Sequence, residues 1–117
     1  MQIKRVLVVD DERIIRFVLR THLENDGYEV QEAADGEEAL TLLRQSIPDV
    51  IFLDLLMPRL DGIEFLKRMK NITSTPRIII LTAYGSMFEE ASQLGAADFI
   101  EKPMNPEKIR QTLARLS

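Results

Sequence analysis

The sequence predicts an α/β fold in which helices cover both faces of a parallel, five-stranded sheet. Short apolar runs that end in a polar residue are typical of strands buried on both faces of such a sheet. These runs alternate with segments of helical periodicity, and right-handed crossovers then return every strand in the same direction. The expected strands are 5–9, 29–33, 50–53, 78–81 and 98–101, and the expected helices are 12–26, 36–45, 62–70, 87–94 and 106–116.

Local residue choices support these elements in chain order. The strands at 5–9, 50–53 and 78–81 are nearly unbroken apolar runs, whereas 29–33 carries a weaker strand signal. Gly27 and Gly95 stand where two helices are expected to end, because glycine is favoured just past a helix C-terminus. Pro106 suits the first turn of the last helix. No linker or repeat interrupts this order.

Length and composition exclude several classes of protein. A chain of 117 residues fits one domain, here 1–117, with an ordinary core. It contains no cysteine, so disulfides, thiolate metal sites and cysteine nucleophiles are excluded. No apolar stretch is long enough for a signal peptide or a membrane span, and we expect a cytoplasmic protein. The net charge of −4 disfavours direct binding of nucleic acid.

Polar side chains of a particular kind stand at the ends of four expected strands. Because the carboxyl ends of parallel strands meet at the edge where open α/β folds bind ligands, these side chains are expected to converge. Carboxylates, a hydroxyl and an ammonium together suit a phosphoryl group and a metal ion. The residues are Asp10, Asp11, Asp54, Thr82 and Lys102.

Four segments resemble the signature of the receiver domain of bacterial two-component response regulators, and the resemblance extends over essentially the whole chain. It implies a flavodoxin-like, three-layer (βα)5 fold with strand order 2-1-3-4-5. Tyr84-Gly85 and the lack of an output domain are most similar to the stand-alone regulators of phosphorelays. The four segments are Val8 to Glu12, Leu53 to Gly62, Leu81-Thr82-Ala83 and Lys102-Pro103.

The resemblance implies that Asp54 is a nucleophile that receives a phosphoryl group from a phosphohistidine. The alternative is that an Asp after a buried strand only caps a turn. Mg²⁺ is the expected metal, because clustered carboxylates repel one another and Mg²⁺ prefers oxygen ligands. Asp10, Asp11, Asp54 and the backbone carbonyl of Leu56 would hold it. For Asp11, an N-cap role in the helix that starts at 12 is the alternative.

The remaining site residues are also implied by the resemblance. Lys102 would pair with Asp54 and then with phosphoryl oxygens, aimed inward by a cis bond to Pro103. Thr82, the backbone of Leu56 and the backbone N–H of Ala83 would contact the phosphoryl group. Phe99 would be a switch aromatic whose movement changes the face formed by 87–94, 98–101 and 106–116, where a downstream target binds. The alternatives are a strand residue for Thr82 and a core residue for Phe99.

Leu56 and Tyr84 would flank the path of a hydrolytic water, and neither offers a group that orients it. A long phosphoryl lifetime is therefore expected.

The helix at 12–26 has more apolar residues than one face can bury. At about 100° per residue, Ile14, Phe17 and Val18 lie off the stripe formed by Ile15, Leu19, His22 and Leu23. We expect these three to form a docking surface for a sensor histidine kinase or histidine phosphotransferase. Ordinary surface scatter is the alternative, and His22 is expected to be structural.

Other functions remain in competition. A receiver that is part of a longer regulator with a C-terminal effector domain would carry the same signature. A Mg²⁺-dependent phosphatase with an Asp nucleophile needs a second acid two residues on, where Leu56 stands. A flavin-binding module needs a Gly- or Ser-rich first turn, and the turn after 5–9 is acidic.

Overall fold

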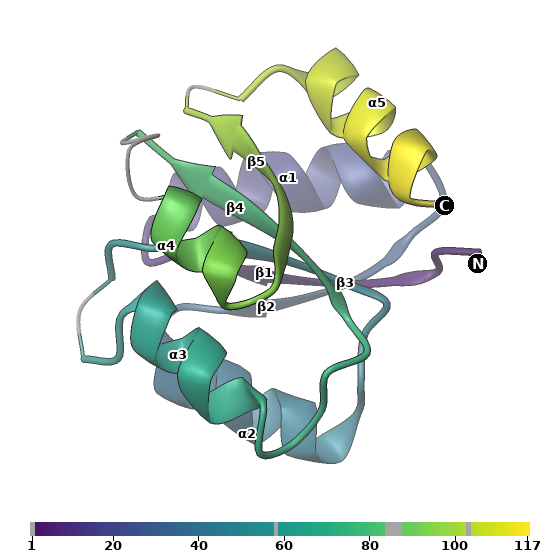
Figure 1. Cartoon of the computed structure of the whole chain (residues 1–117). Coiled ribbons are helices and arrows are strands. Elements are labelled where there is room, and N and C mark those ends of the chain that lie inside the picture. Colours follow the sequence, from purple (N-terminus) through teal and green to yellow (C-terminus); the bar gives the residue numbers. More distant parts are fainter. Residues whose placement is uncertain (1, 58, 84–87, 103) are drawn as a thin grey trace.

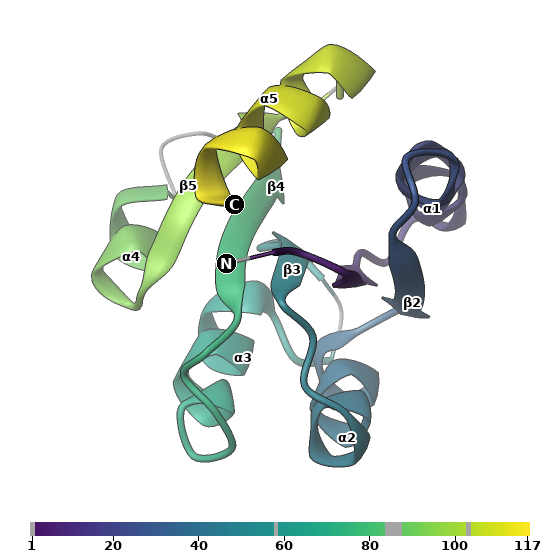
Figure 2. The ribbon, with the colours of Figure 1, turned by 90° about the vertical axis from the view of Figure 1, so that its right-hand side faces the viewer.

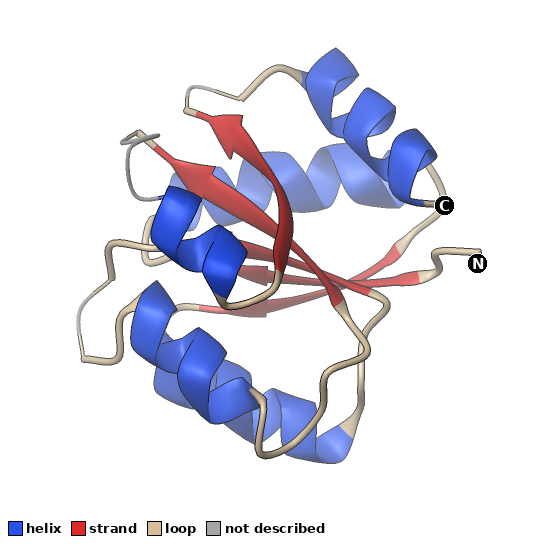
Figure 3. Ribbon diagram, in the orientation of Figure 1, coloured by secondary structure: helices blue, strands red, loops and turns tan. Residues whose placement is uncertain are grey.

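A computed structural model describes residues 2–57, 59–83, 88–102 and 104–117. Strands and helices alternate along the whole chain (Figure 1, Figure 3). The strands are β1 (Arg5–Val9), β2 (Glu29–Ala33), β3 (Val50–Asp54), β4 (Arg77–Thr82) and β5 (Ala96–Glu101). The helices are α1 (Arg13–Asn25), α2 (Gly36–Gln45), α3 (Gly62–Met69), α4 (Phe88–Gln93) and α5 (Pro106–Leu116).

The five strands form one parallel sheet of order β2-β1-β3-β4-β5, which confirms the expected order 2-1-3-4-5. Figure 3 shows the arrowheads directed to the same side of the sheet. The pairing of β4 with β5 contains one irregularity, between Ile78 and Ile79. β5 begins two residues before its expected start at 98, and Met87, the expected first residue of α4, lies outside the described residues.

The sheet separates two hydrophobic cores, because successive side chains of a strand point to opposite faces. On β1, Val6 and Val8 belong to one core and Leu7 and Val9 to the other. The first core is completed by α1 and α5, and the second by α2, α3 and α4. Figure 2 shows α2 and α3 side by side on one side of the sheet, opposite α1 and α5. This three-layer arrangement leaves the strand ends free to carry polar groups.

The rotation of α1 follows the expected stripe. Leu19 and Leu23 are fully buried against the sheet. Ile14, Phe17 and Val18 are 72%, 66% and 37% exposed, so they lie off the core face. None of the helices in the described residues is long and apolar enough to cross a membrane.

Three helices begin with a side-chain cap and one does not. Asp35, Asp61 and Asn105 accept backbone N–H groups at the starts of α2, α3 and α5. The N-cap residue of α1 is Glu12, and its side chain makes no cap hydrogen bond. The alternative of Asp11 as the N-cap is therefore wrong, because the helix begins one residue later than expected. Gly27 and Gly95, with φ of 95° and 104°, follow helices as expected.

Candidate functional site

The strand order brings the predicted polar residues to one edge of the sheet. Asp10 directly follows β1, Asp54 ends β3, and Val9 pairs with Leu53 across these neighbouring strands. Thr82 ends β4, and its carbonyl oxygen accepts the backbone N–H of Lys102 at 2.9 Å. Four segments far apart in sequence thus meet because their strands are adjacent and parallel.

A cavity of about 290 Å³ lies at this edge, and of the predicted polar residues Asp10 alone is not part of its lining. Thr82 is buried, whereas Ala83 is exposed at the rim. Leu56 is 48% exposed beside Asp54. The lining consists of Asp11, Glu12, Asp54, Leu56, Thr82, Ala83 and Lys102.

Lys102 is the cation of this site, and three carboxylates lie around its ammonium. Nζ is 2.8 Å from Oδ2 of Asp10, 3.3 Å from Oε1 of Glu12 and 3.4 Å from Oδ2 of Asp54. The expected pair with Asp54 is present, but Asp10 is the nearer partner. Burial alone would lower the pKa of Lys102, yet its carboxylate contacts, above all with Asp10, raise it. The side chain therefore stays charged.

Asp54 has an environment that disfavours its charged form. Its Oδ1 accepts the backbone N–H of Leu56 at 3.1 Å, and its side chain is almost wholly buried. Burial, followed by the charge of Asp10, raises the pKa of Asp54 to about 6, against the opposing effects of Leu56 and Lys102. A carboxylate held in this way gains stability from any added positive charge.

A second group of carboxylates is suited to a cation. Single oxygens of Asp10, Asp11 and Glu12 lie within 4.8 Å of one another. Asp10 is buried, and burial raises its pKa. Its Oδ1 accepts the N–H of Glu12 at 2.8 Å, while Oδ2 has an ion-pair contact with Lys102 and no hydrogen bond of good geometry among the described residues. This buried, incompletely satisfied oxygen fits Mg²⁺, which prefers oxygen ligands.

The loop between β3 and α3 is held close to the acid residues. A Cβ on Gly62 would lie 2.7 Å from the carbonyl oxygen of Asp54, so only glycine allows this approach. Arg59 has a φ of 64°, and its guanidinium lies 3.3 Å from Oδ2 of Asp35, the buried N-cap of α2. The loop that carries Leu56 is thereby tied to the neighbouring loop.

The predicted switch aromatic does not line the cavity. Phe99 is half-buried on β5, and its ring centroid lies 4.9 Å from that of Phe88 on α4. The side chain therefore links the fourth helix to the edge strand. Tyr84 and Pro103, to which lifetime and cis-bond roles were assigned, lie outside the described residues.

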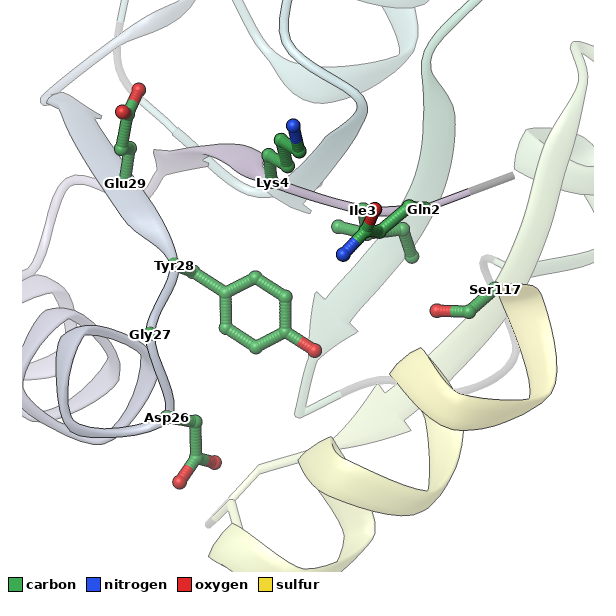
Figure 4. A pocket seen from close by; sticks show the side chains of 8 residues that line it. All are labelled: Gln2, Ile3, Lys4, Asp26, Gly27, Tyr28, Glu29 and Ser117. Carbon is green, nitrogen blue, oxygen red and sulfur yellow. The ribbon is translucent and has the colours of Figure 1, made fainter.

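A wider depression of about 680 Å³ lies at the opposite end of the strands. Figure 4 shows the Tyr28 ring projecting into it. Its acids are already paired, Asp26 with Arg110 at 3.0 Å and Glu29 with Arg5 at 3.4 Å. This depression lacks the clustered acids of the smaller cavity.

Sequence reasoning missed one residue of the site. Glu12 contacts Lys102 and lines the cavity. Of the acids after β1, only Asp10 and Asp11 were predicted to belong to the site. The signal was available, because Glu12 is a third acid directly after the strand-end pair. Its contact with Lys102 spans 90 positions of sequence, so spacing alone does not reveal it.

The raised pKa of Asp54 gives a pH-dependent stability. The folded chain binds a proton at Asp54 more tightly than the unfolded chain, so the contribution of Asp54 to the free energy of unfolding falls as pH rises from 3.8 to about 6. Without divalent cations, Asp54→Asn should raise the free energy of unfolding by about 1–3 kcal/mol near pH 8 and leave it nearly unchanged near pH 4. Urea denaturation at the two pH values measures this.

Asp49→Asn is the control with the opposite sign. Backbone N–H groups of Arg5 and Lys4, at 3.0 and 2.8 Å, lower the pKa of Asp49. Its stabilising contribution is present above its ordinary pKa and is lost as pH falls, so this variant should lose stability near neutral pH. Equal stability of the parent and Asp54→Asn near pH 8 would contradict the unfavourable charge at Asp54.

Comparisons with known proteins agree with this geometry. The response regulator receiver domain family matches residues 6–114. Sporulation initiation phosphotransferase F of Bacillus subtilis (strain 168) is 39% identical over 98% of this chain and 94% of its own length. The chemotaxis response regulator CheY4 of Vibrio cholerae is 38% identical, with a TM-score of 0.89 and coverage of 99% and 100%.

Further relatives include both a chain of similar extent and longer proteins. Response regulator TrrA of Thermotoga maritima, solved in complex with Mg²⁺-BeF, is 34% identical, with a TM-score of 0.87 and coverage of 97% of this chain and 99% of that one. The chain spans about half the length of several other curated relatives, such as 42% of the probable transcriptional regulator ycf27 of Guillardia theta, to which it is 44% identical over 91% of its own length. On this sequence and structural similarity, the chain belongs to the response regulator receiver domain family, whose members are phosphoacceptor signalling proteins.

Proposed function

We propose that Asp54 accepts a phosphoryl group from a phosphohistidine and that the chain then switches or relays this signal. The observation that carries the proposal is the placement of a buried carboxylate in a cavity, 3.4 Å from a lysine ammonium. A carboxylate oxygen of Asp54 forms the new bond to phosphorus as the bond from phosphorus to the histidine nitrogen breaks. The reaction depends on positioning and charge neutralisation, and the receiver catalyses its own phosphorylation in this sense.

Mg²⁺ is the proposed cofactor. Asp10, Asp11 and Asp54 would hold it together with the backbone carbonyl of Leu56, and Glu12 stands beside them. Bound there, the ion supplies positive charge to the phosphoryl oxygens and relieves repulsion among the carboxylates. The Mg²⁺-BeF complex of TrrA supports this proposal.

Three further groups have proposed roles in binding the phosphoryl group. The ammonium of Lys102 neutralises phosphoryl oxygens as a point charge. The hydroxyl of Thr82 and the backbone N–H of Ala83 contact them, and the small side chain of Ala83 leaves room at the rim. Movement of Thr82 would make space for Phe99 and so alter the surface of α4, β5 and α5, where a downstream protein binds.

Two settings fit such a receiver. We take residues 1–117 as one receiver domain that relays a phosphoryl group, supported by the nearly complete coverage of the Bacillus relative. The shorter coverage of the transcriptional regulators favours the second setting, a receiver joined to an effector domain. Phosphorylation at Asp54 is common to both.

The partner that supplies the phosphoryl group is a sensor histidine kinase or a histidine phosphotransferase. We propose that it docks on the apolar patch formed by Ile14, Phe17 and Val18 of α1. The patch is exposed on the helix that begins beside Asp11 and Glu12, so a docked partner would stand near the acids. In the free chain this apolar patch is in contact with water, which is unfavourable. The apolar surface of a docked partner would exclude that water.

The acceptor is tested by acetyl phosphate, a donor that needs no docking. With Mg²⁺, the parent should gain one phosphoryl group by intact mass, and removing Mg²⁺ with EDTA should prevent this. Asp54→Ala should abolish the gain because the nucleophilic oxygen is lost. Asp61→Asn is the control, since an Asn oxygen can still accept the N–H of Glu64 that Asp61 accepts at 2.9 Å. Phosphorylation of Asp54→Ala at the parental level would refute the proposal.

The docking patch is tested by Phe17→Ser. Because Phe17 is 66% exposed, the free energy of unfolding should change by no more than about 0.5 kcal/mol. Phosphorylation by acetyl phosphate should be unchanged, whereas transfer from the cognate phosphohistidine protein should slow. Leu19→Ala, on the buried side of the same helix, should instead cost about 2–5 kcal/mol. Unchanged transfer to Phe17→Ser would remove Phe17 from the docking surface.

The lifetime of the phosphorylated state is tested at Leu56. The side chain is 48% exposed at the cavity and offers no polar group to orient a water. Leu56→Asn should speed loss of the phosphoryl group after donor removal by about tenfold at most, below the usual effect of general acid–base catalysis. Ile47→Asn, at a 39% exposed residue before β3, is the control. An unchanged decay rate would show that Leu56 does not limit hydrolysis.

A further inference from the structure

Glu12 occupies the N-cap position of α1 but does not use its side chain there. The N-cap residues of α2, α3 and α5 each accept a backbone N–H from their own helix. The Glu12 side chain makes no such bond, and its Oε1 lies 3.3 Å from Nζ of Lys102. A carboxylate at a helix start has therefore been directed to a residue beyond β5.

The ammonium of Lys102 is surrounded by three anions in this arrangement. Nζ donates to Oε1 of Glu12 at 3.3 Å and to Oδ2 of Asp54 at 3.4 Å, and Oδ2 of Asp10 is an ion-pair contact at 2.8 Å. An incoming phosphoryl oxygen needs a share of the same ammonium, so it competes with these carboxylates.

Burial decides which contact is the weakest. The side chains of Asp10 and Asp54 are 0% and 7% exposed, whereas that of Glu12 is 60% exposed. An exposed ion pair is screened by water and contributes little, and a released Glu12 carboxylate is readily solvated. A released Asp10 would remain buried and would keep only the backbone N–H of Glu12 as a partner for its charge, which is costly. Glu12 is the group that can leave.

We propose that Glu12 is a positioning residue that holds Lys102 in the unphosphorylated protein and competes with the phosphoryl group for its ammonium. The inference rests on the proposed function of Asp54 as the acceptor. Glu12 thereby lowers both the rate of phosphorylation and the stability of the phosphorylated state. Loss of the Glu12 contact, with Lys102 still held by Asp10, leaves the ammonium in place with a free N–H donor for the phosphoryl oxygen.

The test compares phosphorylation rates and analogue binding at saturating Mg²⁺. The initial rate with acetyl phosphate is measured by intact mass, and the affinity for beryllofluoride by titration calorimetry. Glu12→Gln should raise both by about two- to fivefold, the range expected for one exposed ion pair. Glu12→Asp keeps the charge but is one methylene shorter, so it should lose the contact and show the same increase. Glu101→Gln, with the same change in net charge next to Lys102, should match the parent.

Several results would overturn the inference. Glu12→Gln that matches the parent or Glu101→Gln would show that no specific competition exists. A Glu12→Asp variant that matches the parent would show that charge near the cavity matters and contact with Lys102 does not. Slower phosphorylation of Glu12→Gln would make Glu12 a required group. The proposed function would be refuted by a different result, in which the parent gains no phosphoryl group that Asp54→Ala abolishes. The two failures are therefore distinguishable.

Discussion

The ion contacts between Lys102 and the buried carboxylates are the constraint on which the site depends. Asp10 and Asp54 lie at the ends of neighbouring strands and would repel each other in a poorly solvated pocket. One ammonium, 12% exposed, lies within 3.4 Å of both, and the backbone N–H groups of Glu12 and Leu56 add one hydrogen bond to each. The pocket is therefore short of positive charge before any reaction. A site in this condition favours a divalent cation, and it is prepared for a group whose oxygens need the same cations.

The sheet makes this concentration of charge tolerable. Successive side chains of each strand point into two different cores, so apolar side chains are buried on both faces of the sheet. Polar groups therefore gather where the strands end. The two cores thus hold the acids in place, while the acids themselves lie outside the apolar packing. Close backbone approaches at Gly62 and the tie between Arg59 and Asp35 hold the β3–α3 loop over the same edge.

Much of this could be predicted from the sequence, for identifiable reasons. Apolar runs such as those of β3 and β4 define strands that have no other place than the middle of a parallel sheet. The residues at their ends then had to meet, and Asp54 and Lys102 do lie at ion-pair distance. The exposure of Phe17 followed from helical periodicity alone. Each of these features depends on a local sequence pattern, and the tertiary structure retains it.

What could not be predicted depends on side-chain direction across the fold. Whether Lys102 would prefer Asp10 or Asp54 is decided by differences of less than an ångström in distance, which no spacing rule contains. Glu12 was missed because an acid at a helix start has an ordinary local use, and here that use is absent. The position of Phe99 against Phe88 likewise depends on how α4 lies on β5.

Asp35 links two loops by using both of its carboxylate oxygens. Oδ1 accepts the N–H of Glu38 at the start of α2, and Oδ2 contacts Arg59 in its left-handed conformation. A change at position 35 would therefore disturb a helix and a loop at once, whereas glycine at 59 would relieve backbone strain while ending the ion pair. The acid at 35 keeps its second contact only while a cation stands at 59. In this way a pair outside the cavity connects the start of α2 to the loop that follows Asp54.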